Sequence, residues 1–298
     1  MTKAKQLRQL LNSKPILKVV GAFDAMSAKL VESHDFDAVW AGSFAISATH
    51  ALPDASIMTM TEFLAVAANM VESCKIPIIA DCDTGFGGPT NVSHMVKKYE
   101  SAGITAISIE DKKFPKQNSL LENGKQELLS EKDFVAKLIA AKDAKNDENF
   151  MIIARVEALI AGLGIDEAMK RAKAYENAGA DAILIHSKKN TPDEIFEFAD
   201  LWDGSVPLVT IPTVYPTVSI DELVSHKIKM VIYANQTLRV AHNAMSNLLE
   251  QLSKAKSLSE VNIDLSTMED IFHLQQMYNI KNQEKIIEEN LRKMGYIS

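Results

Sequence analysis

The chain contains the stretch Gly103-Ile-Thr-Ala-Ile-Ser-Ile-Glu-Asp-Lys112, an apolar run that ends in two acidic residues. The run predicts a short buried strand. A polar segment with a proline follows it through Asn123-Gly124, before the next helical pattern. A carboxylate at a strand end, followed by a long loop, is typical of a metal site with a lid. A charged, solvated turn is the alternative interpretation of this stretch.

Similar apolar runs recur along the chain, separated by amphipathic helical patterns. The predicted strands are 16–20, 38–42, 77–83, 104–110, 150–157, 182–186, 206–211 and 230–234. The helical patterns between them include 61–73, 91–102, 131–144, 166–178 and 192–201. Eight strands alternating with helices favour an α/β fold of the closed (β/α)8 TIM-barrel type. A doubly wound open sheet is the alternative, although no Gly-x-Gly-x-x-Gly follows the first strand to support dinucleotide binding.

Capping residues predict where several helices begin and end. Thr90 or Asn91 is expected to start one helix and Ser130 another, while Ala-Gly pairs at 102–103 and 178–179 are expected to stop helices. Three further helical patterns follow the last strand, at 236–256, 268–278 and 283–293. We therefore expect a single domain with its barrel over about 15–240 and a helical extension over about 241–298. Such an extension packs across the barrel or onto a neighbouring subunit.

The composition limits the class of protein. With 298 residues, 47% hydrophobic and 24% charged, the chain resembles an ordinary soluble protein. A net charge of −7 without a basic stripe argues against binding to nucleic acid or an anionic membrane. Two cysteines do not make a disulfide framework, which favours a reducing compartment. No signal peptide or transmembrane pattern is present, so we expect a cytoplasmic protein.

Polar residues gather at the predicted C-terminal strand ends, where parallel barrels place their active sites. Asp81 and Asp83 are expected to share a strand face, because alternate residues point the same way. Neighbouring strand ends supply Glu110, Arg155, Glu157 and His186. Acids this close together repel one another unless a cation lies among them, and oxygen ligands favour Mg²⁺ or Mn²⁺. The arginine fork suits a phosphate or carboxylate bound there. A buried salt-bridge cluster is the structural alternative.

Four motifs around these residues resemble those of the phosphoenolpyruvate mutase and isocitrate lyase superfamily. The resemblance is closest to the mutases and runs from about Gly21 to Ala241. The motifs are Asp81-Cys82-Asp83-Thr84-Gly85-Phe86-Gly87, Glu110-Asp111-Lys112 with Phe114-Pro115-Lys116 and Asn118-Ser119, Ala154-Arg155-Val156-Glu157-Ala158, and Ala180-Asp-Ala-Ile-Leu-Ile-His-Ser-Lys-Lys189. The resemblance implies a modified (β/α)8 barrel whose C-terminal helix is swapped between subunits, usually within a dimer of dimers.

The resemblance also assigns roles to residues. It implies Mg²⁺ held by Asp81, with Asp83 and Glu110 nearby through water. The implied catalytic residues are Asn118, Arg155, His186, Asp54 and Lys116, of which Lys116 belongs to a gating loop. The implied substrate-binding residues are Trp40, Gly42, Ser43, Phe44 and Ser119, with the backbone amides of Ser43 and Phe44 meeting the phosphoryl group.

The chain departs from the mutase pattern at one place. The mutases read Trp-Gly-Ser-Gly-Leu, whereas this chain has Trp40-Ala-Gly-Ser-Phe44. The serine hydroxyl that faces the phosphoryl group is therefore missing at 42 and displaced to 43.

The activity implied by the resemblance is the interconversion of phosphoenolpyruvate and 3-phosphonopyruvate, in which a P–C bond forms through a metaphosphate-like species. The loop 112–124 would exclude water, and a downstream phosphonopyruvate decarboxylase would remove the product. The first alternative is phosphonopyruvate hydrolase, which carries threonine at the position of Asn118. The second is a carbon–carbon lyase of the isocitrate or methylisocitrate lyase type. Those lyases need a cysteine in a Lys-Lys-Cys-Gly-His loop, and no cysteine follows Glu110. The third is a barrel retained as a non-catalytic binding protein.

Overall fold

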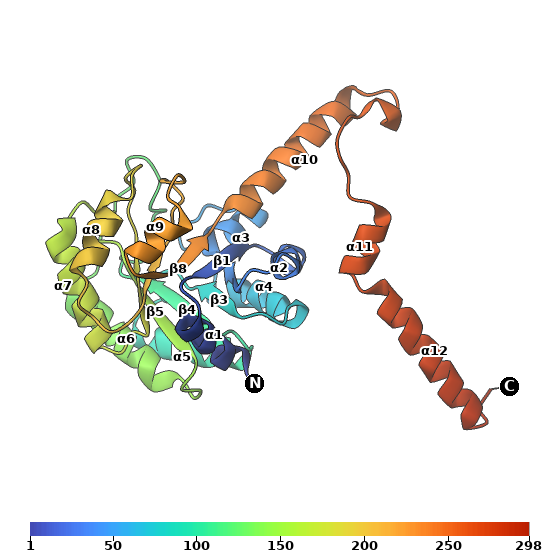
Figure 1. The fold of residues 1–298 in the computed structure, drawn as a ribbon, viewed down its shortest axis with the longest axis horizontal. Coiled ribbons are helices and arrows are strands. Elements are labelled where there is room, and N and C mark those ends of the chain that lie inside the picture. The colour runs from blue at the N-terminus through green and yellow to red at the C-terminus, as the bar shows by residue number, and fades with distance from the viewer. Residues whose placement is uncertain (298) are drawn as a thin grey trace. The chain divides into compact units, whose positions relative to one another are not determined.

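Eight parallel strands close into a barrel in the computed structural model, which describes residues 1–297 (Figure 1). Each strand pairs with the next along the chain, and β8 pairs with β1. The strands are β1 Leu17–Ala22, β2 Ala38–Ala41, β3 Ile78–Asp81, β4 Ala106–Glu110, β5 Met151–Val156, β6 Ala182–Ile185, β7 Leu208–Thr210 and β8 Ile228–Tyr233. The predicted TIM-type barrel is confirmed, and the open-sheet alternative is wrong.

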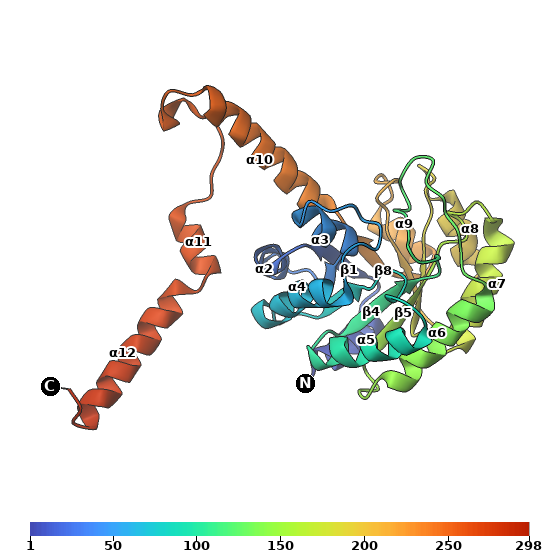
Figure 2. The same ribbon diagram turned by 180° about the vertical axis from the view of Figure 1, so that it is seen from behind.

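Helices surround the barrel on the outside, as Figures 1 and 2 show from opposite sides. They are α1 Lys3–Ser13, α2 Ala25–Ser33, α3 Ser43–Thr49, α4 Met60–Ser73, α5 Pro89–Ser101, α6 Glu131–Ala144, α7 Gly164–Asn177, α8 Asp193–Leu201 and α9 Ile220–Ser225. The first helix is different, because its Leu7 and Leu11 pack with the side chains inside the barrel. Arg8 of this helix also pairs with Asp181 before β6, at 2.7 Å. Helix α1 thus covers the end of the barrel at which the strands begin.

Local capping explains most of the helix boundaries. The Ser130 hydroxyl accepts from the amide of Asp133, as predicted. Gly103 and Gly179 have positive φ directly after the helix-ending alanines, also as predicted. Helix α5 differs, because it begins at Pro89 and not at Thr90 or Asn91. Proline suits the first helical position, since its fixed φ is helical and its missing N–H costs nothing there.

The core has two layers. Side chains of one set fill the barrel, among them Trp40 and Leu184, and those of the other lie between the strands and the outer helices. Cys82 belongs to the outer layer and is fully buried. Its side chain therefore packs among the helices as a small hydrophobic residue.

Strand register brings distant residues together at the end of the barrel where the strands finish. Glu110 pairs with Arg155, and Asp81 pairs with Ser108. Gly21 lets strand β1 lie very close to the backbone after β8, because a Cβ at this position would be 2.0 Å from the carbonyl oxygen of Ala234. The site described below is built on this end.

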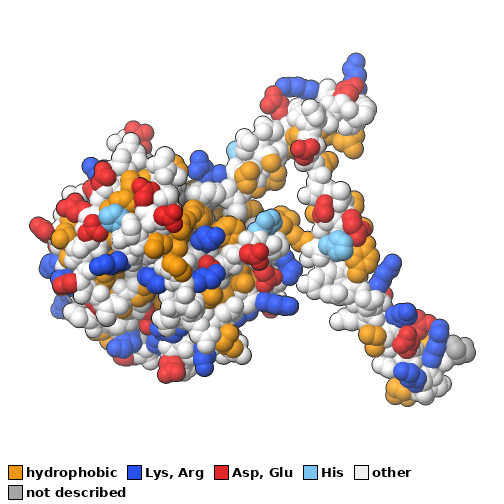
Figure 3. All heavy atoms as spheres, in the orientation of Figure 1, with side chains coloured by type: hydrophobic (Ala, Val, Ile, Leu, Met, Phe, Trp, Pro, Cys, Tyr) orange, Lys and Arg blue, Asp and Glu red, His pale blue; other side chains and the backbone are white. Residues whose placement is uncertain are grey.

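Residues 241–298 form a second compact unit, and helix α10 (Gln236–Lys254) runs across the junction. The unit contains helices α11 Met268–Leu274 and α12 Met277–Lys293, neither of which has a buried residue. Figure 3 shows apolar side chains on this unit. The exposed apolar residues of α12 include Ile286, Ile287 and Leu291. Among residues 1–297, no helix has the length and apolar character needed to cross a membrane.

Candidate active site

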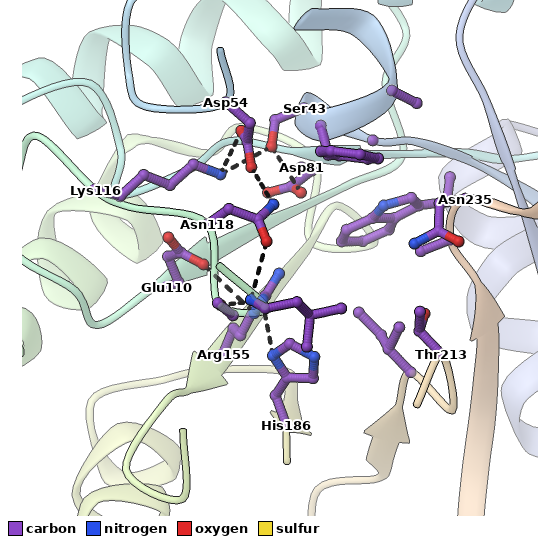
Figure 4. A pocket seen from close by; sticks show the side chains of 18 of the residues that line it. Ser43, Asp54, Asp81, Glu110, Lys116, Asn118, Arg155, His186, Thr213 and Asn235 are labelled. Carbon is purple, nitrogen blue, oxygen red and sulfur yellow. Dashed lines mark hydrogen bonds and ion pairs between the residues drawn. The ribbon is translucent and has the colours of Figure 1, made fainter. Parts of the chain in front are cut away.

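A cavity of about 170 Å³ opens where the strands end (Figure 4). Every predicted site residue except Asp83 lines it. Thr213 and Asn235, from the segments after β7 and β8, also line it and were not predicted, and the same is true of Ala45, Gln117, Leu120, Ile211 and Ala234. Its size suits a small metabolite, since pockets for drug-sized ligands are larger, at about 300 Å³ and above.

The acidic side of the cavity is formed by Asp54, Asp81 and Glu110, and Asp83 lies next to them outside the lining. Strand β3 ends at Asp81, and Asp83 lies in the left-handed region with φ of 50°. The expected alternation along a strand therefore does not apply to Asp83, which turns beneath the cavity. Its amide donates to Asp81 Oδ1 at 3.2 Å. Asp83 Oδ2 and Glu110 Oε1 are buried without a hydrogen-bond partner, so this cluster has unused acceptor capacity.

The Lys116 ammonium lies among these acids, as Figure 4 shows. It is 3.0 Å from Asp54 Oδ1 and 2.5 Å from Asp83 Oδ1, and it donates to Ser43 Oγ at 3.1 Å. Burial lowers the pKa of Lys116, but Asp83 and the neighbouring carboxylates outweigh burial and raise it well above its usual value. Burial raises the pKa of Asp83 to about 6. At neutral pH the ammonium is thus a permanent counter-charge for the acids.

The basic side of the cavity consists of Arg155 and His186, held by Glu157. Arg155 Nε donates to Glu157 Oε1 at 2.5 Å, and Arg155 Nη2 lies 2.9 Å from His186 Nδ1. Nδ1 also lies 2.9 Å from Glu157 Oε1. Nδ1 therefore lies between a guanidinium, which can only donate, and the ionised Glu157 carboxylate, which can only accept. Burial lowers the pKa of His186, which favours the neutral ring. These contacts are all made by Nδ1, which leaves Nε2 for a ligand.

Glu157 and Lys112 make a buried support behind the cavity. Glu157 Oε2 accepts from Ser119 Oγ at 2.7 Å and lies 3.3 Å from Lys112 Nζ, which itself donates to Ser119. Burial raises the pKa of Glu157, but Arg155, His186 and Lys112 outweigh it and hold that pKa well below its usual value. Sequence reasoning noted Glu157 at its strand end and missed Lys112. A lysine directly after the Glu-Asp pair was the only available signal.

Glu110 and Asp111 point in different directions although they are adjacent. Glu110 lines the cavity, 3.5 Å from Arg155 Nε. Asp111 is buried in the helix layer, where it accepts from Tyr175 OH at 2.7 Å and Arg171 at 3.1 Å. Burial raises its pKa to about 6. Its other oxygen accepts from the amide of Glu157 at 2.9 Å, so Asp111 is a structural anchor between strand ends.

Asn118 is fixed by two hydrogen bonds at the mouth of the cavity. Its Nδ2 donates to Asp54 Oδ2 at 2.7 Å, and its Oδ1 accepts from the amide of Leu120 at 2.9 Å. The amide side chain therefore has a defined orientation in the cavity that Arg155 also lines (Figure 4).

The acid cluster suits a hard cation. Its donor atoms are carboxylate oxygens, two of them unpartnered, which matches the preference of Mg²⁺. No three His, Cys, Asp or Glu side chains among residues 1–297 converge tightly enough to hold an ion by themselves. Mg²⁺ usually retains several waters, so a site with one direct carboxylate and others acting through water agrees with this geometry.

Comparisons with known proteins agree with the fold. The sequence profile described as phosphoenolpyruvate phosphomutase matches residues 7–253. The chain is 44% identical over 276 residues to phosphonopyruvate hydrolase from Variovorax sp. (strain Pal2), covering 92% of this chain and 95% of that protein. The structure of phosphoenolpyruvate phosphomutase from Streptomyces platensis subsp. rosaceus superimposes with a TM-score of 0.92 at 44% identity, covering 95% and 98% of the two chains.

A further solved structure is a phosphonopyruvate hydrolase complexed with oxalate and Mg²⁺. It superimposes with a TM-score of 0.90 at 41% identity, and the match covers 96% of this chain and 99% of that one. The chain therefore belongs to the phosphoenolpyruvate phosphomutase family, within the enzymes of the phosphoenolpyruvate mutase and isocitrate lyase superfamily.

Proposed function

We propose that this protein is a phosphoenolpyruvate mutase, which interconverts phosphoenolpyruvate and 3-phosphonopyruvate. The observation that carries the proposal is Asn118, the position at which the resemblance places threonine in the hydrolases. Its amide is held by Asp54 and by the amide of Leu120, and it lines the same cavity as Arg155 and His186. An amide offers hydrogen-bond donors to a phosphoryl group but does not accept a proton from water.

The basic residues stabilise the phosphoryl group during transfer. The P–O bond of the enol ester breaks, and a P–C bond forms on the same three-carbon unit. A loose, metaphosphate-like species must be held while the enolate carbon turns toward it. Arg155 donates to its oxygens and His186 faces them through Nε2, and Glu157 fixes both side chains so that little reorganisation is needed. The amides of Ser43 and Phe44 begin α3, whose N-cap Gly42 makes no side-chain capping bond, and they add donors.

Asp81 would hold Mg²⁺ directly, with Asp83 and Glu110 acting through water. When bound, the ion offsets the negative charge of the substrate's carboxylate and enolate oxygens. The residues of this chain then keep the two ends of the substrate apart. The acids bind the end that carries the metal, while Arg155 and His186 bind the phosphoryl end. This division follows from the positions of the two groups of side chains in the cavity (Figure 4).

The loop 112–124 is proposed to be the lid. Its Lys116 contacts acids from two other segments, and the amide of Lys116 donates to Ser56 Oγ at 3.1 Å. These contacts hold the loop over the cavity. Exclusion of water is essential for a mutase, because water would convert the metaphosphate-like species to phosphate.

Phosphonopyruvate hydrolase is the second candidate, favoured by the 44% identity to the Variovorax enzyme. The two activities share the same cleavage of a phosphorus bond and differ in whether water is admitted. A carbon–carbon lyase has less support, because no cysteine follows Glu110 to serve as its acid.

Phosphorus NMR of the protein with phosphonopyruvate and Mg²⁺ tests the proposal. We expect phosphoenolpyruvate to appear, since the enol ester is the favoured side of the equilibrium in this family. Free phosphate as the main product would assign the protein as a hydrolase. An unchanged spectrum would reject both activities. Because the equilibrium favours phosphoenolpyruvate, net phosphonate synthesis requires a downstream enzyme, such as a phosphonopyruvate decarboxylase, in the same cytoplasmic compartment.

The C-terminal extension is proposed to exchange helices between subunits of a dimer of dimers. Apolar residues of α10 and α12, such as Leu249 and Ile287, are exposed, and such faces mark association surfaces. Truncation after Ser257 is therefore expected to lower the oligomer mass or to cause aggregation. Light scattering of the full and truncated chains measures this, and a soluble truncated protein of unchanged assembly would contradict the exchange.

A further inference from the structure

The hydroxyl of Ser43 connects the loop to the acid cluster. Ser43 Oγ donates to Asp81 Oδ2 at 3.0 Å and accepts from Lys116 Nζ at 3.1 Å. A hydroxyl has one proton and two lone pairs, so both bonds form at the same time. The side chain is buried, and water therefore does not compete with these bonds. Lys116, Ser43 and Asp81 form a continuous chain of hydrogen bonds from the loop to β3.

In this structure, the packing of Trp40 leaves no room for a side chain at position 42. A Cβ at Gly42 would lie 2.9 Å from both Cδ1 and Nε1 of Trp40, closer than side-chain carbons normally approach. The Trp40 ring is fixed in the core of the barrel, packed with residues of several strands. A side chain at 42 would have to displace this ring. Ser43, the first residue of α3, reaches Asp81 and Lys116 without that displacement.

We propose that Ser43 is a positioning residue that couples closure of the loop to the orientation of the Asp81 carboxylate. The inference rests on the proposed function insofar as Asp81 is a metal ligand and 112–124 is a lid. Ser43 supplies Lys116 with a neutral acceptor beside two carboxylates, and it supplies Asp81 with a donor that fixes one of its oxygens. Loss of the hydroxyl weakens the contacts that keep the loop closed, and it also leaves the orientation of the Asp81 carboxylate less well fixed.

Limited proteolysis of the full-length protein by a lysine-specific protease reports on loop closure. Lys113 and Lys125 are exposed on either side of the buried Lys116, so cleavage near them reports opening. Ser43→Ala is expected to raise the cleavage rate in this segment by about tenfold, the effect typical of one hydrogen bond to a charged group. Ser43→Thr retains the hydroxyl and is expected to restore protection. Ser47→Ala is the matched control, because Ser47 is buried on the same helix but does not line the cavity.

A double-mutant cycle isolates the proposed bond. If Ser43 acts through Lys116, Ser43→Ala changes cleavage of the wild type but has little further effect in a Lys116→Ala background. Mg²⁺ affinity, measured by calorimetry, is also expected to fall in Ser43→Ala, because the carboxylate of Asp81 is less well oriented. Additive effects of the two substitutions, with unchanged Mg²⁺ affinity, would overturn the inference. That result is independent of the phosphorus NMR experiment, which tests whether the product is phosphoenolpyruvate or phosphate.

Discussion

Asp81→Ala is expected to abolish turnover of phosphonopyruvate while the barrel stays folded. The proposed metal stabilises charge by several kcal/mol, and each ~1.4 kcal/mol is a factor of ten in rate, so we expect a loss of at least about 10³-fold. The fold should survive because, within residues 1–297, the hydrogen bonds of this carboxylate are those with the Ser43 hydroxyl and the Asp83 amide. Phosphorus NMR measures turnover, and circular dichroism on the same samples reports the folded fraction.

Two controls separate loss of metal from loss of structure. Chelator-treated wild type is expected to be inactive and to recover when Mg²⁺ is restored. Asp203→Ala removes an exposed acid that pairs only with Lys173 at the surface, so it should keep full turnover. Full activity of Asp81→Ala, or of a metal-free preparation, would show that turnover does not depend on a metal bound by the acid cluster.

The barrel and the strand-end residues of the cavity could be predicted because their signals are local, whereas Asp54, Lys116 and Asn118 were assigned only by the family resemblance. Apolar runs of strand length identify β4 and β5, and the polar residues at their ends fall at one edge by the geometry of parallel strands. Glu110 and Arg155 are therefore neighbours in the structure, paired directly across the two strands. The same reasoning works for His186, which directly follows β6.

What a loop touches could not be predicted in this way. Lys116 reaches acids from two other segments, and no periodic pattern records such contacts. The left-handed turn at Asp83 and the opposite directions of Glu110 and Asp111 depend on how the chain leaves a strand. Thr213 and Asn235 come from segments without a motif and enter the cavity only because the barrel closes.

The choice between mutase and hydrolase also depends on loop contacts that no sequence pattern records. Overall sequence identity does not distinguish the two activities, since the hydrolase from Variovorax and the mutase from Streptomyces platensis are both 44% identical to this chain. The proposed metal site and phosphoryl-binding residues would serve both reactions equally. We propose that the difference lies in whether a water molecule reaches the phosphoryl group, which would depend on the loop that carries Asn118.

Asn118→Ala is therefore expected to lower mutase turnover by about 10²–10³-fold, the cost typical of one lost transition-state donor. Its partner Asp54 would lose a donor as well. Glu122→Ala is a suitable control, because Glu122 is exposed on the same loop and should leave turnover unchanged.

Asn118→Thr is expected to change the fate of the phosphoryl group and not only the rate of turnover. Threonine is shorter than asparagine, so it leaves room for a water, and its hydroxyl can orient that water by accepting a hydrogen bond from it. We expect less phosphoenolpyruvate and more free phosphate from phosphonopyruvate, measured in one phosphorus spectrum. The ratio of the two products is the informative quantity, since general damage to the site lowers both together. If Asn118→Ala keeps near-normal mutase turnover and Asn118→Thr leaves the product ratio unchanged, the loop is only a cover. Partitioning would then be controlled deeper in the barrel, by Arg155 and His186.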